Sequence, residues 1–404
     1  MNVIFLTLVQ MQDISSSGIY TDLMRKFRDE GHNVYVVSPI ERRSGLTTSF
    51  ENESGIHVLR VETLNITKSG IVEKGIGTIL LELQYKNAIR KYLKGVQFDL
   101  ILYSTPPITF TNVVKALKKS NPKALTYLML KDIFPQNAVD IGLLSATGIK
   151  GVMYKYFRRI EKKLYNISDY IGCMSPANVD YIIKHNPQLK REKLEIAPNS
   201  YSLKEDQSKN LVDIIEIRRK YNLPIDKPIF IYGGNMGKPQ GVPFVIECLR
   251  AIKDRNDCHF VVVGDGTEYP KLKAFIAEEN PQAVSLINKL NKDDYDKLAK
   301  ACDIGLIFLD YRFTIPNYPS RLLPYLMERK PIVAFTDSSS DVGTIAQENG
   351  YGFYSPSNSV TAFVQTIDRI LMFDFKQMGE KGYQFFLNNY TIDHTYNVIV
   401  NHFK

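Results

Sequence analysis

The chain has 404 residues, of which 44% are hydrophobic, and carries a formal net charge of +8 at pH 7. This length allows two domains of about 200 residues, each with its own core, and no apolar run reaches the ~18 residues that a membrane-spanning helix needs. The first residues resemble a buried strand rather than a signal peptide, which favours a cytoplasmic protein, and the four widely spaced cysteines favour neither a disulfide nor a metal site.

Short apolar runs alternate with amphipathic segments through the first half of the chain. Strands are expected at residues 3–9, 34–37, 56–61, 99–103, 124–130, 168–175 and 194–199, and helices at residues 19–30, 79–93 and 110–119. This alternation is typical of a doubly wound parallel α/β domain.

Small polar residues follow two of these expected strands. Ser17 and Gly18 lie in the loop after the first strand, and Ser104 comes directly after the strand at 99–103. Open α/β sheets bind ligands at the carboxyl ends of their strands, so we expect these three residues to face a binding site. The alternative at Gly18 is a tight turn that binds nothing.

One carboxylate occupies the same kind of position. Asp132 follows the expected strand at 124–130 and precedes Pro135, which fixes the turn. A carboxylate at such a strand end can accept a proton from a substrate or hold a hydroxyl group, so Asp132 is the candidate catalytic residue. The alternatives are a helix cap and an ion pair with Lys131.

Positive charge is concentrated in the first half, where residues 1–200 hold 27 Lys and Arg against 18 Asp and Glu. Part of this excess lies in a basic amphipathic helix expected at residues 150–165. Such a helix could lie against anionic lipid headgroups, which predicts peripheral contact with a membrane. A solvated basic face on a helix packed against the core is the alternative.

The second half begins after a polar linker at residues 200–210 and repeats the alternation. Strands are expected at residues 228–232, 260–263, 284–287, 304–309 and 332–335, and helices at 243–252, 269–277 and 293–301, with a largely helical end from 360 that breaks near 388–390. The second half is therefore also expected to be a parallel α/β domain.

Two stretches of the second half suit phosphate groups. Gly234, Asn235 and Lys238 lie in a glycine-rich loop, where backbone N–H groups can approach an anion and a lysine adds charge. Ser320 and Arg321 are predicted to open a helix after several prolines, which places an arginine beside unpaired N–H groups. A loop without ligand and an ordinary capped helix are the respective alternatives.

The order of these motifs is similar to that of a known family. The motifs are Lys131-Asp132-Ile133-Phe134-Pro135, Met174-Ser175-Pro176, Pro198-Asn199, Gly234-Asn235-Met236-Gly237, Gly264-Asp265-Gly266 and the segment at residues 315–326. Together they resemble the retaining, nucleotide-sugar-dependent glycosyltransferases of family 4. Within that family they are most similar to the capsule and O-antigen sub-group that includes the L-fucosamine transferases.

The resemblance implies a GT-B fold of two Rossmann-like domains that face a cleft. It implies that residues 1–203 bind the acceptor, that residues 204–385 bind the nucleotide sugar, and that residues 386–404 cross back to the first domain. The predicted contacts of the diphosphate are Gly234, Asn235, Lys238, Ser320, Arg321 and the backbone at Leu322 and Leu323. Asn288 and Leu290 would lie at the nucleobase.

The same resemblance predicts the substrates. The donor would be UDP-linked, carrying an N-acetylated amino or deoxyamino sugar, and the acceptor a lipid-linked saccharide at the inner face of the cell membrane. No metal, cofactor or nucleic acid is expected, because backbone N–H groups and cationic side chains neutralise the leaving diphosphate.

The chain departs from the family pattern at several positions. Pro316 and Pro324 stand where many members carry two glutamates, so Glu328 or Asp341 would have to hold the donor ribose. Lys131 stands where many relatives have a histidine. These departures leave two alternatives to a transferase, an enzyme like UDP-N-acetylglucosamine 2-epimerase and a non-catalytic protein that binds nucleotide sugars.

Overall fold

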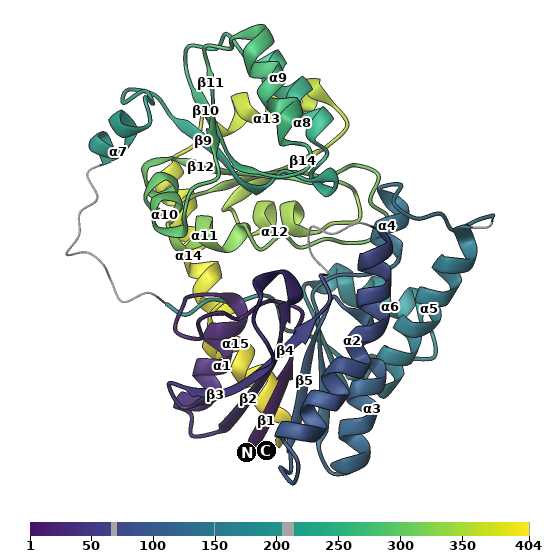
Figure 1. Cartoon of the computed structure of the whole chain (residues 1–404). Coiled ribbons are helices and arrows are strands. Elements are labelled where there is room, and N and C mark those ends of the chain that lie inside the picture. Colours follow the sequence, from purple (N-terminus) through teal and green to yellow (C-terminus); the bar gives the residue numbers. More distant parts are fainter. Residues whose placement is uncertain (66–70, 149, 204–213, 404) are drawn as a thin grey trace. The chain divides into compact units, whose positions relative to one another are not determined.

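The computed structural model describes residues 1–65, 71–148, 150–203 and 214–403. The chain divides into two compact units, one formed by Met1–Ser202 with Thr391–Lys404 and the other by Leu203–Tyr390 (Figure 1). The sequence placed the second boundary at residue 386, which falls within helix α14 (Phe375–Asn389), and the chain changes units only after Tyr390. Most of the predicted linker lies outside the described residues.

The sheet of the first unit has eight strands in the order β3-β4-β2-β1-β5-β6-β7-β8. Their bounds are β1 (Asn2–Leu6), β2 (Asn33–Glu41), β3 (Ser49–Glu53), β4 (Ile56–Thr63), β5 (Leu100–Thr105), β6 (Leu125–Leu130), β7 (Tyr170–Cys173) and β8 (Leu194–Ile196). The order reverses between β1 and β5, and ligands bind at such switch points in parallel sheets.

One strand of this sheet contradicts the prediction of a purely parallel arrangement. β3 pairs antiparallel with β4 through a two-residue turn in which Ser54 and Gly55 have φ angles of 50° and 83°. Two consecutive positive φ angles match the tight hairpin turn that suits the twist of the strands. β3 was not predicted because this edge strand has no buried face and therefore no apolar alternation.

Helices cover both faces of this sheet. They are α1 (Ile19–Asp29), α2 (Ile71–Tyr92), α3 (Thr111–Ser120), α4 (Gln136–Asp140), α5 (Lys150–Ile167), α6 (Pro176–His185) and α15 (Ile392–Val400). α2 begins at Ile71 rather than near residue 79. The last helix, α15, packs against α1, where Lys26 pairs with Asp393 at 2.5 Å and the rings of Phe27 and Tyr396 meet edge to face.

The second unit has six parallel strands in the order β11-β10-β9-β12-β13-β14. The strands are β9 (Ile229–Asn235), β10 (His259–Asp265), β11 (Val284–Asn288), β12 (Ile304–Phe308), β13 (Ile332–Thr336) and β14 (Gly352–Pro356). The helices are α7 (Ile214–Lys220), α8 (Val242–Ala251), α9 (Tyr269–Glu279), α10 (Lys292–Ala301), α11 (Leu322–Met327), α12 (Val342–Glu348), α13 (Val360–Ile370) and α14. The switch point lies between β9 and β12.

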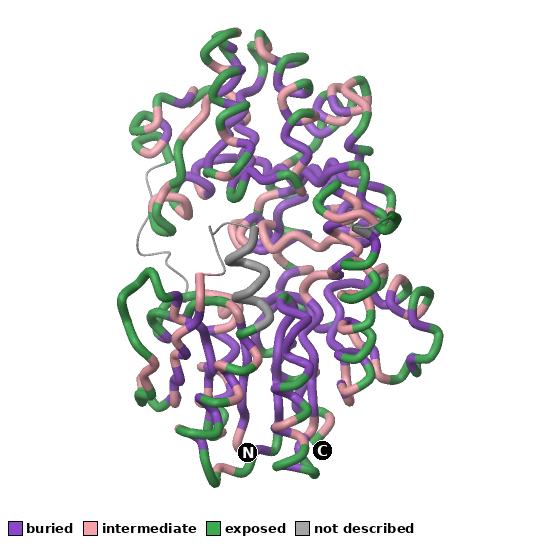
Figure 2. The backbone as a smooth tube through the Cα atoms, turned by 45° about the vertical axis from the view of Figure 1, so that its right-hand side comes forward, coloured by how far each residue is buried: buried purple, intermediate pink, exposed green. Residues whose placement is uncertain are grey.

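The two sheets form the cores of their units, and apart from β3, β8 and β11 their strands are buried along most of their length (Figure 2). In the second unit, for example, Phe230 stacks on Phe260 with ring centroids 4.7 Å apart. Burial of each such side chain contributes about 1.5–3 kcal/mol to the stability of the folded unit. This packing holds the strand ends in fixed register. In the part of the chain that the structure describes, no helix has the length and apolar character needed to cross a bilayer.

Candidate active site

The carboxyl ends of three neighbouring strands form the base of a site in the second unit. The strand register places Gly264 of β10 opposite both Gly234 of β9 and Asn288 of β11. Gly264 has a φ of 153°, and a Cβ atom there would lie 1.9 Å from the carbonyl oxygen of Gly234. Only glycine fits so close an approach. Gly234, Asn235 and Asn288 are exposed at this end of the strands, so a ligand can reach them.

Arg321 is half-buried and lies beside Gly234, where a Cβ atom would be 3.8 Å from its carbon ζ. Its Nη2 donates to the carbonyl oxygen of Asn235 at 3.4 Å, and its carbon ζ lies 4.8 Å from the centroid of the Tyr232 ring. Its Nη1 is buried and has no acceptor. Among the described residues, no Asp or Glu pairs with it, so this half-buried cation is uncompensated and suited to an anionic ligand.

Two further tyrosines support this position, and the sequence did not point to any of the three. A Cβ on Gly233 would meet the Tyr295 hydroxyl at 2.2 Å, and the Tyr325 hydroxyl donates to the carbonyl oxygen of Ile231 at 3.2 Å. The rings come from β9, α10 and α11, which are far apart in the sequence. Aromatic faces attract a guanidinium without neutralising it, so the charge stays available to a ligand.

The predicted helix start at Ser320 and Arg321 is wrong in detail. Helix α11 begins at Leu322, and Arg321 precedes it. The N–H groups of Leu322 and Leu323, which were expected to face a diphosphate, already donate to the carbonyl oxygens of Pro319 and Ser320 at 3.2 and 3.1 Å. The side chain of Arg321, rather than the helix terminus, is therefore the candidate anion-binding group at this position.

The other predicted donor contacts are arranged around the same edge. Lys238 begins a 3₁₀ turn after β9, is exposed, and forms no ion pair with any described residue. Asn288 ends β11, and its Oδ1 accepts a hydrogen bond from the Tyr269 hydroxyl at 2.6 Å. Leu290 is half-buried in the loop that follows. These residues stay candidates for contacts with the nucleotide.

The two candidates for the ribose contact lie at opposite ends of the parallel strands. Asp341 precedes α12, just beyond the carboxyl end of β13. Glu328 ends α11 and precedes the amino end of β13, beside Lys330. Because the strands are parallel, Glu328 lies at the edge away from Gly234, so its proposed contact with the ribose is incorrect and Asp341 is the candidate that the fold retains.

A buried carboxyl group that the sequence analysis missed anchors the segment before Arg321. Asp337 accepts hydrogen bonds from the backbone N–H of Ser339 and from both N–H and Oγ of Ser340, at 2.8–2.9 Å. Oγ of Ser340 in turn accepts from the N–H of Asn317 at 2.9 Å. Burial raises the pKa of Asp337 to about 6. The one available signal was an aspartate followed by serines directly after a strand.

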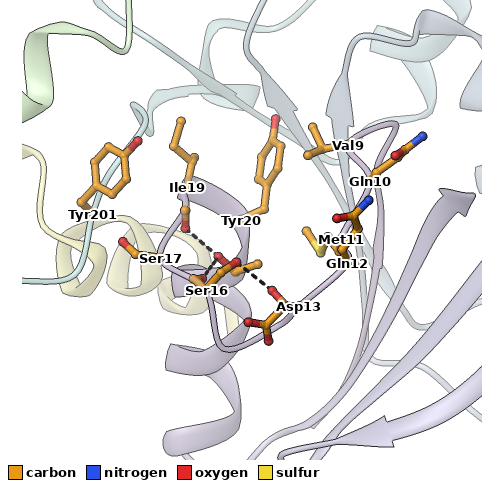
Figure 3. Close-up of a pocket in the computed structure, with 12 residues that line it drawn as sticks. Val9, Gln10, Met11, Gln12, Asp13, Ser16, Ser17, Ile19, Tyr20 and Tyr201 are labelled. Atoms are coloured by element: carbon orange, nitrogen blue, oxygen red, sulfur yellow. Dashed lines mark hydrogen bonds between the residues drawn. The ribbon is translucent and has the colours of Figure 1, made fainter. Parts of the chain in front are cut away.

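In the first unit, a pocket of about 620 Å³ opens at the loop between β1 and α1. Ser17 and Gly18 line it as predicted from their position, and Figure 3 shows the side chains of Tyr20 and Tyr201 pointing to the same side of it. Ser104 is buried behind the lining, where its hydrogen bond with Tyr20 opposes the increase in the pKa of Tyr20 caused by burial. Ser17 and Gly18 therefore lie at the pocket, whereas Ser104 is covered and does not face it as expected.

Charged side chains that were not predicted hold this loop in shape. Asp22 accepts from the N–H of Gly18 at 3.0 Å and pairs with Arg25 at 2.6 Å. Arg25 also donates to the carbonyl oxygen of Ser16, and Arg60 donates to the carbonyl oxygens of Met11 and Gln12 at 3.0 Å. Each hydrogen bond to a loop carbonyl oxygen restricts the backbone conformation of the loop, so the pocket is preformed.

Asp132 lies after β6 with both carboxylate oxygens engaged. Oδ1 accepts from the N–H of Ile133 at 2.8 Å, and Oδ2 accepts from Nδ2 of Asn137 at 2.7 Å. It does not cap α4, which follows Pro135, and Lys131 donates instead to the carbonyl oxygen of Ala197. Burial raises the pKa of Asp132 to about 6, so the group is mainly ionised at neutral pH and can take up a proton.

These sites can now be compared with known proteins. Residues 213–384, which make up most of the second unit, match the family model described as "Glycosyl transferases group 1". The protein is a glycosyltransferase. This finding favours sugar transfer over the epimerase and non-catalytic alternatives.

Two curated relatives of this glycosyltransferase carry the same kind of description. The probable glycosyltransferase WbjE of Pseudomonas aeruginosa is 22% identical over 321 residues, which cover 77% of this chain and 75% of WbjE. The putative colanic acid biosynthesis glycosyl transferase WcaI of Escherichia coli is 23% identical over 62% of this chain and 60% of WcaI.

The fold of the glycosyltransferase is shared with solved structures. Anabaena Alr3699/HepE in complex with UDP superposes with a TM-score of 0.67 at 13% identity, covering 100% of this chain and 99% of HepE. Together with the two parallel Rossmann-like sheets, this likeness shows that the chain has the GT-B fold.

Proposed function

We propose that the protein transfers a sugar from a nucleoside diphosphate, UDP in our proposal, to a lipid-linked saccharide during synthesis of a capsule, O-antigen or exopolysaccharide. The name of WcaI supports the pathway class, and the UDP complex of HepE supports the nucleotide. The sugar we propose is an N-acetylated amino or deoxyamino sugar, as in the L-fucosamine transferases of family 4.

The observation that carries this proposal is the uncompensated guanidinium of Arg321. Its buried Nη1 lacks an acceptor, and the open strand edge at Gly234 lies beside it. A diphosphate placed there would supply the missing acceptor and two negative charges. Each charge-assisted hydrogen bond is worth about 1.5–3 kcal/mol. The same charge would stabilise the diphosphate as it leaves, with Lys238 as a second, exposed cation.

The remaining contacts of the nucleotide follow from the strand order. From the diphosphate at β9, the next strand ends are those of β10 and β11, so we propose that the nucleobase lies toward Asn288 and Leu290. Asp341 lies beyond β13, on the other side of Arg321 from β11, so in this orientation it is our candidate for a contact with the transferred sugar rather than with the ribose. The nucleotide sugar acts as substrate, and our proposal assigns no cofactor or metal ion to the reaction.

We propose that the first unit binds the acceptor. Its preformed pocket combines the rings of Tyr20 and Tyr201 with the polar loop at Ser17 and Gly18, a composition suited to the apolar faces and hydroxyl groups of a saccharide. Asp132 would hold the attacking hydroxyl group or accept its proton. The sugar would be transferred with retention of its anomeric configuration, as in family 4.

Isothermal titration calorimetry with UDP, GDP and dTDP tests the donor site. The parent protein is expected to bind UDP, and Arg321→Ala is expected to bind it much more weakly. Binding of none of the three nucleotides, or unchanged binding by the variant, would remove this site. With a panel of UDP-sugars and a lipid-linked acceptor, NMR of the product's anomeric proton then tests retention. An epimerised free sugar nucleotide would favour the epimerase alternative.

A further inference from the structure

Helix α5 presents an apolar surface near its beginning that nothing in the described structure covers. Val152, Met153 and Tyr156 lie in its first two turns with 69%, 50% and 48% of their surface exposed. Leu143, in the connection that leads into the helix, is 60% exposed. Exposed apolar side chains are common singly, but a group of them in consecutive turns indicates a contact surface.

The charged residues on the exposed side of this helix all have the same sign. Lys155, Arg159, Lys162 and Lys163 are exposed, and none pairs with an acidic group in the described residues. The only acidic residue of α5, Glu161, is buried and pairs with Arg158. Helical spacing places Val152, Tyr156, Arg159 and Lys163 along one line, so apolar and basic groups share one face.

We propose that this face of α5 docks the protein on an anionic phospholipid bilayer. Val152, Met153 and Tyr156 would enter the boundary between headgroups and acyl chains, and the four basic side chains would contact lipid phosphates. The single sign of the charge favours an anionic bilayer over a protein partner, whose surface would offer both signs. The proposal complements the lipid-linked acceptor of the proposed function, but vesicle binding itself requires neither donor nor acceptor.

The docking helix is packed directly against the segment that carries Asp132. The ring of Phe157 meets Phe134 edge to face with centroids 5.1 Å apart, and the Tyr154 hydroxyl donates to Oε1 of Gln136 at 2.9 Å. Because both contacts are made just after Asp132, a bilayer bound to α5 would lie at a fixed position relative to that carboxylate. This arrangement suits an acceptor whose lipid stays in the membrane.

Sedimentation of the full-length protein with vesicles tests the proposal. The parent is expected to bind vesicles of equal parts phosphatidylglycerol and phosphatidylcholine, to release them at high salt, and to bind pure phosphatidylcholine weakly. V152S/M153S should lose most of this binding, and K155A/R159A should lose about fivefold for each charge removed. The matched controls M372S, at a side chain 85% exposed in the second unit, and K273A on α9 should bind as the parent does.

A fluorescent reporter provides a second measurement that does not depend on loss of binding. The chain contains no tryptophan, so V152W and M372W each carry a single one. Phosphatidylglycerol vesicles should shift the emission of V152W to shorter wavelength and leave that of M372W unchanged. Absence of salt-sensitive binding, or equal shifts in both variants, would overturn the docking surface. UDP binding measured on the same samples shows separately whether the donor site is intact.

Discussion

Replacement of Arg321 by alanine should separate ligand binding from stability. The variant removes the guanidinium group, whose Nη1 has no hydrogen-bond acceptor in the protein. Loss of one charge-assisted hydrogen bond to a diphosphate, worth about 1.5–3 kcal/mol, weakens UDP binding about 10- to 150-fold. Arg321→Lys keeps the charge but not the planar fork, so it should fall between the parent and the alanine variant.

The effect of the same substitution on folding should be small. The guanidinium gains about 1 kcal/mol from stacking on Tyr232, but its burial without a counter-ion has a desolvation cost of similar or larger size. We therefore expect the thermal unfolding midpoint without ligand to stay the same or rise, while the stabilisation by UDP disappears.

Calorimetry with UDP and thermal unfolding with and without UDP measure both quantities. The matched control is Arg369→Ala, which removes a guanidinium stacked on Phe353 with its carbon ζ 4.5 Å from the ring centroid. That variant should bind UDP like the parent. If Arg321→Ala bound UDP within twofold of the parent, or lost affinity only because it unfolded, the assignment of Arg321 as the diphosphate ligand would be refuted.

Three further substitutions test other parts of the site. Asp132→Asn should lower kcat by about 100-fold or more. Burial raises the pKa of Asp132 to about 6, and the reaction requires the ionised form. The kcat/KM of the parent should therefore fall about tenfold per pH unit below pH 6. Asp337→Ala leaves Ser340 without its partner, which should lower the unfolding midpoint by the equivalent of about 1–3 kcal/mol and weaken UDP binding several-fold. Gly264→Ala places a Cβ against the carbonyl oxygen of Gly234 and should destabilise the second unit by about 4 kcal/mol or more, seen as loss of soluble protein or a much lower midpoint.

Each of these has a result that would count against it. A pH profile that is flat between pH 5 and 7 would show that Asp132 does not titrate in the rate-limiting step. Normal UDP affinity in a destabilised Asp337→Ala protein would separate that anchor from the donor site. A Gly264→Ala protein that melts like the parent would mean that the strand ends can move apart.

The secondary structure followed closely from local patterns wherever an element carries an apolar run or an apolar face that becomes buried. The strands at β4, β6, β11 and β13 and the helices α1 and α5 lie within a few residues of their expected bounds. Prediction failed for β3, an edge strand without a buried face, for β14, which was not expected as a strand, and for the start of α2, where glycines suggested a loop. Whether such a segment pairs with a neighbouring strand depends on tertiary contacts, and the local sequence does not show those contacts.

The site residues divide in the same way. Gly234, Arg321 and Asp132 could be selected from the sequence because each follows a strand or stands in a recognisable motif. Glu328 was a wrong choice. It lies close to Arg321 along the chain, but α11 stands between them and carries Glu328 to the opposite end of the parallel strands.

The sequence by itself determined that two α/β domains follow one another, and it predicted that an anion-binding group lies near residue 321. Only the tertiary structure decided the surroundings of that candidate group. The tyrosines around it come from three separate elements, and the unmet hydrogen bond of its Nη1 exists only once β9, α10 and α11 have packed together. Burial and register depend on contacts between distant residues, whereas periodicity and turn chemistry depend on neighbours, and only the latter can be read along the chain.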